Sequence, residues 1–116
     1  MINQQEAAIF LEQEMPELQI DNTADGNIYR GMRKLLLHTA GKVCEHNYNA
    51  AAQCFKLASS LHERGNEVVK NTVENVFVFS ISSLLHLANK DRAKLISIIP
   101  ASLYTLYLSQ ACHTGY

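Results

Sequence analysis

Apolar residues recur along much of the chain at the spacing of one face of an α-helix. The first such stripe ends at Pro16 and consists of Ala7, Phe10, Leu11 and Met15. A second lies within residues 28–43 and consists of Ile28, Met32, Leu35, Leu36, Thr39 and Val43. Proline stops a helix, so the pattern predicts a short first helix and a longer second one.

A third stripe, in "HNYNAAAQCFKLASSLHERGN", consists of Ala51, Cys54, Phe55, Ala58 and Leu61. Asn49 is expected to cap this helix, and Gly65 to end it. Asn66 is then expected to cap the next helix, which makes the two helices antiparallel neighbours across a tight turn. Asn89 is expected to cap a short helix near residues 91–99, and Pro100 to open the last one.

Residues 75–89, "NVFVFSISSLLHLAN", contain no charged side chain. The run is shorter than the roughly 20 apolar residues of a membrane helix, and charged residues flank it, so no membrane span is expected. As a β-strand it would have no partner strand. We therefore predict a central buried helix over residues 66–88, with Phe77 and Phe79 in the core.

These segments together predict an all-α fold in a single domain covering residues 1–116. The expected architecture is a compact bundle of five to six helices built on antiparallel helical hairpins. A chain of 116 residues with 47% hydrophobic residues is long enough to bury one core.

Two resemblances support this prediction. Ala51, Phe55 and Ala58 reproduce the Ala-x3-Phe-x2-Ala spacing of the second helix of tetratricopeptide repeats, over eight residues and with no 34-residue repetition. This likeness implies helical-hairpin packing. More broadly, "CFKLASSLHERGNEVVKNTVENVFVFSISSLL" followed by "IIPASLYTLYLSQ" resembles small all-helical bacterial domains of unknown function. That resemblance implies a helical bacterial protein and brings no reaction or ligand with it.

Charge is balanced overall but unevenly distributed. Ten Lys and Arg residues face eleven Asp and Glu residues. Residues 1–25 contain only acidic charges and residues 26–44 only basic ones. The basic residues of the second helix are too few for a nucleic-acid surface in a chain of net charge −1, and the acidic first helix offers them a partner. Nucleic acid is therefore not an expected ligand. The basic side chains in question are Arg30, Arg33, Lys34 and His38.

Three cysteines, at positions 44, 54 and 112, form no disulfide framework, and the N-terminus lacks the pattern of a signal peptide. The expected location is the cytoplasm. The cysteines and histidines also lack the paired spacing of a zinc site, so neither a metal nor a cofactor is expected.

Glu74 lies where the predicted central helix becomes apolar. A carboxylate at such a boundary acts as a general acid or base when burial raises its pKa, or is held by a neighbouring helix in a structural role. The expected polar or ligand site consists of Glu74, Asn71, Asn75, Arg30 and Tyr29.

The uncharged C-terminal helix carries apolar residues over a wide arc. Leu103 and Tyr107 are expected to face inward, and Tyr104 and Leu108 to form an interface with a protein partner or a second copy. A helix that only closes the domain is the alternative. The favoured function is a non-enzymatic protein-interaction, adaptor or regulatory domain. The alternative function is a small helical enzyme or ligand-binding protein that uses the site around Glu74.

Overall fold

The helices follow one another in the order that the apolar stripes predict. The computed structural model describes the backbone of residues 1–18 and 28–115, and side chains as far as Gln110. Its α-helices are α1 (Gln4–Glu14), α2 (Ile28–Cys44), α3 (Tyr48–Arg64), α4 (Glu67–Thr72), α5 (Ile81–Ala88), α6 (Arg92–Ile98) and α7 (Ala101–Gly115). The all-α prediction is confirmed for these residues.

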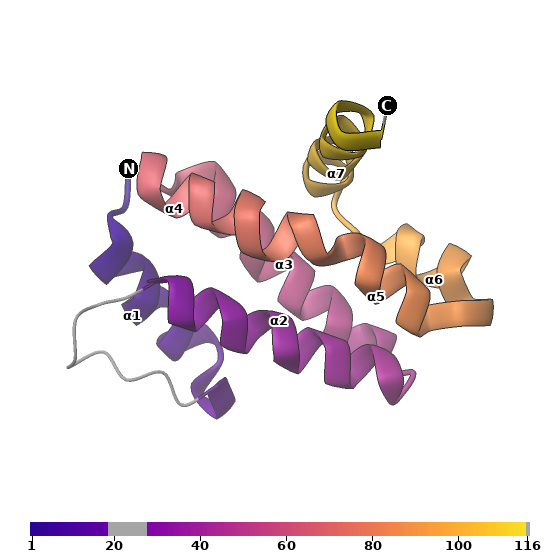
Figure 1. The fold of residues 1–116 in the computed structure, drawn as a ribbon. Coiled ribbons are helices and arrows are strands. Elements are labelled where there is room, and N and C mark those ends of the chain that lie inside the picture. Colours follow the sequence, from indigo (N-terminus) through magenta and orange to yellow (C-terminus); the bar gives the residue numbers. More distant parts are fainter. Residues whose placement is uncertain (19–27, 116) are drawn as a thin grey trace.

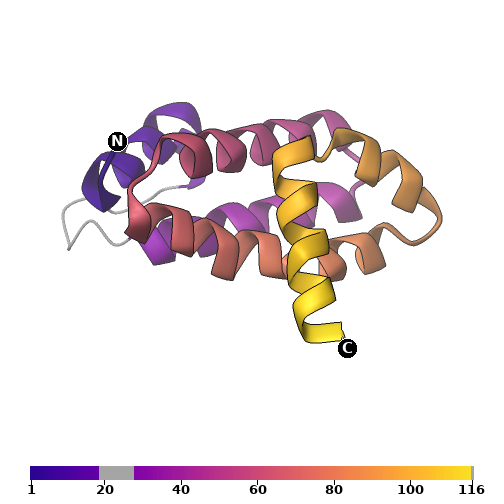
Figure 2. The same ribbon diagram turned by 90° about the horizontal axis from the view of Figure 1, so that it is seen from above.

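Two layers of helices form the body of the domain. α2 and the helical path from α4 to α5 lie side by side on one face, with α3 behind them (Figure 1). α1 packs at one end and α6 at the other. Seen from above, α7 crosses over the path between α4 and α5, and its C-terminal half extends beyond the body (Figure 2). The antiparallel pair that the sequence predicts across Gly65 and Asn66 is α3–α4, and α2 also packs against α3.

Asparagine side chains begin several of these helices. Asn3 forms a capping box with Glu6, with its backbone N–H 3.0 Å from Glu6 Oε1 and its Oδ1 2.9 Å from the Glu6 N–H. Asn66 caps α4 as predicted, accepting a hydrogen bond from the Val69 N–H at 3.1 Å. α3 is capped by Asn47, whose Oδ1 accepts from the Ala50 N–H at 3.2 Å. The prediction of Asn49 was wrong, because Asn49 already lies in the first helical turn.

Asn89 does not cap the helix that follows it. It ends α5 with a backbone φ of 53° and ψ of −110°, a positive-φ conformation that residues other than glycine rarely adopt. The short 3-10 helix η4 (Asn89–Asp91) then leads into α6, which has Asp91 at its N-cap position. The prediction for Asn89 was therefore wrong: the chain reverses at this residue before the next helix begins.

The predicted central helix is present but irregular. Between α4 and α5 the chain forms a π-helical turn, η2 (Val73–Phe77), and a 3-10 turn, η3 (Val78–Ser80). Phe77 is fully buried as predicted, whereas Phe79 is 67% exposed, so the prediction of a core position for Phe79 was wrong. Two residues along a helix correspond to a rotation of about 200°, so Phe79 faces away from Phe77. No element of the described chain covers that side of the helix fully.

The N-terminus is tied to the corner between α3 and α4. The Ile2 N–H donates to the Arg64 carbonyl at 2.9 Å, and the Ile2 carbonyl accepts from the Asn66 N–H at 2.8 Å. Gly65 lies inside this corner, where an added Cβ would stand 2.6 Å from the Leu61 carbonyl oxygen. The absence of a side chain at Gly65 therefore allows the tight approach of α4 to α3.

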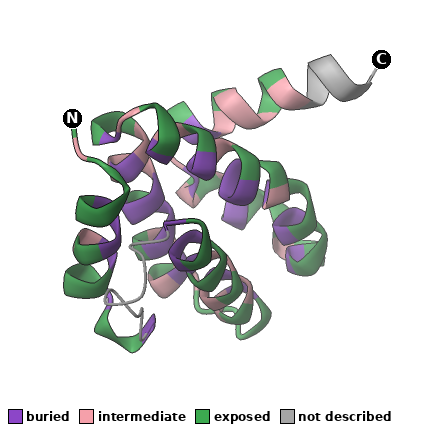
Figure 3. Cartoon of the chain, turned by 60° about the vertical axis from the view of Figure 1, so that its left-hand side comes forward, coloured by how far each residue is buried: buried purple, intermediate pink, exposed green. Residues whose placement is uncertain are grey.

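Buried residues line the inward sides of the helices, and α7 carries half-buried and exposed residues where it leaves the bundle (Figure 3). Leu103 anchors α7 and is fully buried. The largest fully buried side chains of the core include Phe55, Phe77, Met32, Leu35 and Leu61. Within the described residues, the helices are too short or too polar to cross a lipid bilayer.

Candidate functional site

Glu74 joins three helices. Its Oε2 atom lies 2.8 Å from Nε2 of His62 on α3, and its backbone carbonyl accepts a hydrogen bond from Nε2 of Gln110 on α7 at 3.0 Å. The hydroxyls of Ser59 on α3 and Ser102 on α7 lie 3.2 Å apart. The contacts of Gln110 and Ser102 hold α7 across the central path and α3. They involve only the backbone of Glu74, whose carboxylate contacts α3.

The other residues of the predicted polar site do not gather around Glu74. Tyr29 and Asn75 line a groove between α2 and the central path, and the carboxylate of Glu74 is not part of that groove. Arg30 and Asn71 are exposed and line neither this groove nor the larger hollow described below. The five predicted residues are thus divided among different surfaces of the domain.

The groove between α2 and the central path, which we call the α2–η3 groove, has a volume of about 280 Å³. Two of its apolar side chains stand out toward solvent: Leu37 is 66% exposed and Phe79 is 67% exposed. Its lining residues are Tyr29, Arg33, Leu36, Leu37, Asn75, Val76, Phe79 and Ser80.

Helical periodicity explains how the α2–η3 groove forms. Tyr29, Arg33 and Leu37 follow one another at intervals of four residues, so they form a row on α2 beside its buried stripe. Asn75 and Phe79, also four residues apart, are the facing pair on the central path. α2 packs against η2 and α5 along its length, which places these two rows next to each other.

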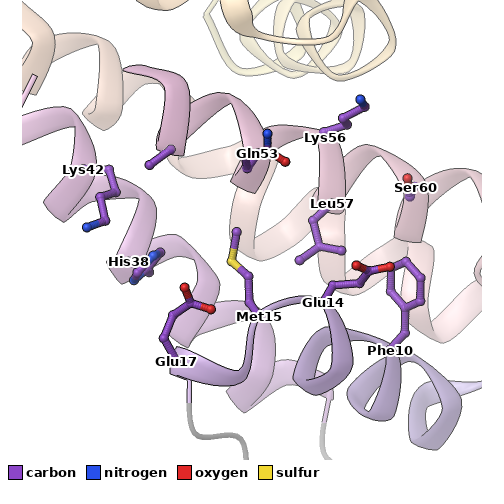
Figure 4. A pocket seen from close by; sticks show the side chains of 11 residues that line it. Phe10, Glu14, Met15, Glu17, His38, Lys42, Gln53, Lys56, Leu57 and Ser60 are labelled. Carbon is purple, nitrogen blue, oxygen red and sulfur yellow. The ribbon is translucent and has the colours of Figure 1, made fainter. Parts of the chain in front are cut away.

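A second hollow, of about 520 Å³, lies among α1, the short 3-10 helix η1 (Pro16–Leu18), α2 and α3 (Figure 4). Its floor is apolar, with Met15 and Leu57 at the centre and Phe10 at one end. Glu14 and Glu17 approach it from the side of α1 and η1, whereas α2 and α3 contribute basic groups. These basic groups are His38, Lys42 and Lys56. The hollow therefore has walls of opposite charge.

A polar cluster ties the turn after α2 to η4. Asp91 Oδ2 lies 3.1 Å from both the Tyr48 hydroxyl and His46 Nδ1. Partial burial, and then the hydrogen bond and the negative charge of Asp91, raise the pKa of the Tyr48 hydroxyl above its ordinary value. His46 itself has a left-handed backbone, with a φ of 60°. The cluster therefore holds the α2–α3 turn against η4, which follows the C-terminal end of α5.

The two cysteines whose side chains are described differ in environment. Cys44 is exposed and Cys54 is fully buried. Burial is the largest cause of the raised pKa of the Cys54 thiol, and the Glu17 carboxylate raises it further, while a hydrogen bond with Thr39 acts against both. No three His, Cys, Asp or Glu side chains in the described ranges converge as metal ligands would.

The predicted interface residues of α7 differ in exposure. Tyr104 is half-buried against the core and lies beside Tyr107, with ring centroids 5.8 Å apart. Leu108 is 46% exposed. Leu103 is fully buried as predicted. Tyr107 and Tyr104 are both half-buried against the core, so the predicted contrast between an inward Tyr107 and an outward Tyr104 was wrong.

Leu37 was not predicted to be a surface residue, and Phe79, which was predicted to lie in the core, is exposed. Leu37 follows two leucines and lies just outside the regular stripe of α2, which was the available signal. A leucine outside the apolar stripe of a helix does not pack against the core through that stripe, so its side chain is available to the surface.

The chain belongs to the family described as a domain of unknown function, DUF7674, whose model matches residues 8–114. This match confirms the resemblance to a helical domain of unknown function. Neither the curated proteins nor the solved structures include a match to this chain.

Proposed function

We propose that this DUF7674 domain is a non-enzymatic protein-interaction module that binds its partner in the α2–η3 groove. The observation that carries the proposal is the exposure of Leu37 and Phe79, each about two-thirds open to solvent on the rim of one groove. Burying such a side chain contributes roughly 1.5–3 kcal/mol when it is covered fully. Two of them on one groove supply an apolar anchor of the kind found at the centre of protein interfaces.

The shape of the groove favours a helical partner segment. Its two sides are helical rows that lie next to each other, and a third helix fits between such rows with apolar side chains at positions i, i+3 or i+4, and i+7. Tyr29, which is 49% exposed, adds an aromatic ring to the rim. Leu36 and Val76 form the deeper apolar part of the groove.

The C-terminal helix is a second proposed contact surface, for a protein partner or for self-association. Leu108 supports this proposal through its exposure, and α7 extends beyond the body of the domain (Figure 2). We favour the α2–η3 groove as the main site, because Tyr104 is half-buried against the domain's own core. The proposed setting is the cytoplasm of a bacterial cell, where an adaptor or regulator would meet its partner.

A capture experiment with matched variants tests the groove. The tagged wild-type domain, Leu37→Ser/Phe79→Ser and Val68→Ser/Leu87→Ser are exposed to a lysate of the source organism. Val68 and Leu87 are exposed apolar residues outside the groove. Val68→Ser/Leu87→Ser therefore controls for non-specific hydrophobic binding. Captured proteins are identified by mass spectrometry, and each candidate partner is purified and measured again as an isolated pair.

We expect a specific partner to bind the wild type and Val68→Ser/Leu87→Ser, and not to bind Leu37→Ser/Phe79→Ser. A purified partner that binds all three proteins equally would contradict the proposed site. Thermal unfolding of the three proteins checks that the serines leave the fold intact.

The hollow shown in Figure 4 favours a second candidate function, the binding of a small zwitterion. Its volume of about 520 Å³ is in the range of small-molecule sites. A ligand ammonium group would face Glu14, which lies on the Phe10 side of Met15, and a carboxylate would face Lys42, which lies on the His38 side (Figure 4). An apolar side chain of the ligand would cover Met15 and Leu57. L-leucyl-L-leucine is a suitable probe, with its N-acetyl and C-amide derivatives as controls that each lack one charge.

Amide chemical shifts measured by NMR show whether the dipeptide binds. Shifts in α1 and α3 that saturate with the dipeptide but not with either derivative support this second function. Unchanged spectra at millimolar dipeptide would exclude it.

A further inference from the structure

Among the described residues, the charged side chains that α2 places at or beside the α2–η3 groove are basic. Arg33 is the charged residue among those that line it. Arg30 and Lys34 are exposed on the same helix, one to the N-terminal side and one to the C-terminal side of Arg33 along the sequence. No acidic residue occurs in α2, so the rim on this side is basic.

The opposite rim is neutral. Asn75 and Ser80 are its polar lining residues. Between Val68 and Asn89 the sequence contains a single acidic residue, Glu74, and its carboxylate contacts His62 on α3. The groove is therefore apolar in its centre and cationic along α2, and the residues of the central path that line it are uncharged.

We propose that the partner segment is an amphipathic helix with acidic residues along one flank of its apolar stripe. This inference rests on the proposed function and names the partner's chemistry. The apolar stripe covers Leu37 and Phe79, the acidic flank faces Arg30 and Arg33, and a neutral polar flank faces Asn75 and Ser80. This arrangement fixes which side of the partner helix meets α2.

Physical considerations assign different roles to the two kinds of contact. The apolar side chains provide most of the binding free energy, because they leave water on association. The exposed arginines contribute mainly to the association rate and to discrimination between partners, since charges at the rim of an interface remain partly solvated. Binding is therefore expected to weaken with salt, whereas its dependence on Leu37 and Phe79 is expected to persist.

Two synthetic helical peptides test this charge preference. Both carry the same leucines at positions i, i+4 and i+7, and one flank of the leucine stripe carries either glutamates or lysines. Fluorescence anisotropy measures the affinity of the full-length protein for each peptide at low and at high salt. We expect the glutamate peptide to bind about tenfold more tightly at low salt, with the difference shrinking at high salt.

Charge reversal in the protein provides the matching test. Arg33→Glu is expected to lower the affinity of the protein for the glutamate peptide and to raise its affinity for the lysine peptide. Lys90→Glu makes the same change of charge at an exposed residue outside the groove, so it controls for net charge and is expected to leave the preference unchanged.

The outcomes separate this inference from the proposed function. If both peptides bind equally, and both are lost in Leu37→Ser/Phe79→Ser, the groove is a docking site and the acidic partner is ruled out. If neither peptide binds, both proposals fail. If a fluorescent single-stranded oligonucleotide binds through Arg30 and Arg33 without needing Leu37 or Phe79, the basic rim is a nucleic-acid surface and the inference is overturned.

Discussion

The ring of Phe77 meets the ring of Phe55 edge to face, with centroids 5.3 Å apart and ring planes inclined by 89°. Phe55 comes from α3 and Phe77 from the π-helical turn, so this contact joins the two layers of the domain. Both side chains are fully buried. Phe79, two residues further on, belongs to the α2–η3 groove instead. Two phenylalanines of one short segment thus serve the core and the surface separately.

Alanine substitutions are expected to separate these two roles. Phe77→Ala should lower the free energy of unfolding by about 3–5 kcal/mol, because it opens a cavity beside Phe55. Phe79→Ala should change it by less than about 0.5 kcal/mol, as substitutions at exposed positions usually do. Urea denaturation followed by circular dichroism measures both values. Equal losses of stability in the two variants would contradict the assignment.

Two glycines should respond to alanine in opposite directions. A Cβ at Gly65 would meet the Leu61 carbonyl oxygen at 2.6 Å and the Val69 side chain, so Gly65→Ala should destabilise the fold by about 1–3 kcal/mol. Gly41, in the exposed part of α2, has nothing within 4 Å of such a Cβ, and Gly41→Ala should stabilise it by about 0.5–1 kcal/mol. Thermal melts of the two variants provide the comparison. A stabilised Gly65→Ala protein would show that the α3–α4 corner has more room than the structure gives it.

Local patterns were enough to predict the fold class, because each helix carries its own apolar stripe and most carry their own end signals. Gly65, for example, ends α3, and Asn66 begins α4 through a hydrogen bond to a backbone N–H three residues further on. The π-helical turn at Val73–Phe77 packs against α2 and α3, and no local residue pattern announces it. The exposure of Phe79 depends in turn on which neighbours happen to cover that side of the helix.

The candidate site could be predicted only in part, for a similar reason. Tyr29 and Asn75 were recognised as residues of interest, and the fold brings them to one groove. Glu74 was separated from them by its contact with His62, which lies twelve residues earlier on another helix. Leu37 belongs to the proposed site because it lines the same groove as Phe79. Relationships of this kind between helices appear only once the helices are placed in space.

The cysteines should differ in reactivity. In a Cys112→Ser background, we expect Cys44 to react quickly with a thiol-specific reagent at pH 8 and Cys54 to react only when the chain unfolds. Cys54 is fully buried and its pKa is raised, so both access and thiolate fraction are low. Absorbance measured with and without denaturant counts the reactive thiols, and adding Cys44→Ser should remove the fast reaction. A second fast thiol in the folded protein would be inconsistent with the placement of Cys54.

The Tyr48 hydroxyl should titrate above its ordinary pKa of 10.0. A raised pKa in the folded state means that folding favours the protonated hydroxyl. Its contribution to stability is therefore complete below about pH 10 and is lost as the pH rises through the folded pKa. Ultraviolet titration of wild type against Tyr48→Phe isolates this group.

Asp91→Asn removes both the negative charge and the carboxylate acceptor, so it should lower the Tyr48 pKa. Glu45→Gln removes a carboxylate of the same turn that contacts Lys42 instead, and should leave the Tyr48 pKa in place. An unchanged Tyr48 titration in Asp91→Asn would show that Asp91 does not govern it.

Binding through the α2–η3 groove is tested most directly by the dissociation constant of the purified partner, measured by titration calorimetry against wild type, Phe79→Ser and Leu87→Ser. Loss of a central apolar anchor typically weakens an interface by more than about 1–2 kcal/mol, so Phe79→Ser should raise the dissociation constant about tenfold or more. Leu87→Ser, at an exposed leucine outside the groove, should leave it within about twofold of wild type. A partner that binds Phe79→Ser as tightly as wild type would contradict the groove as the docking site.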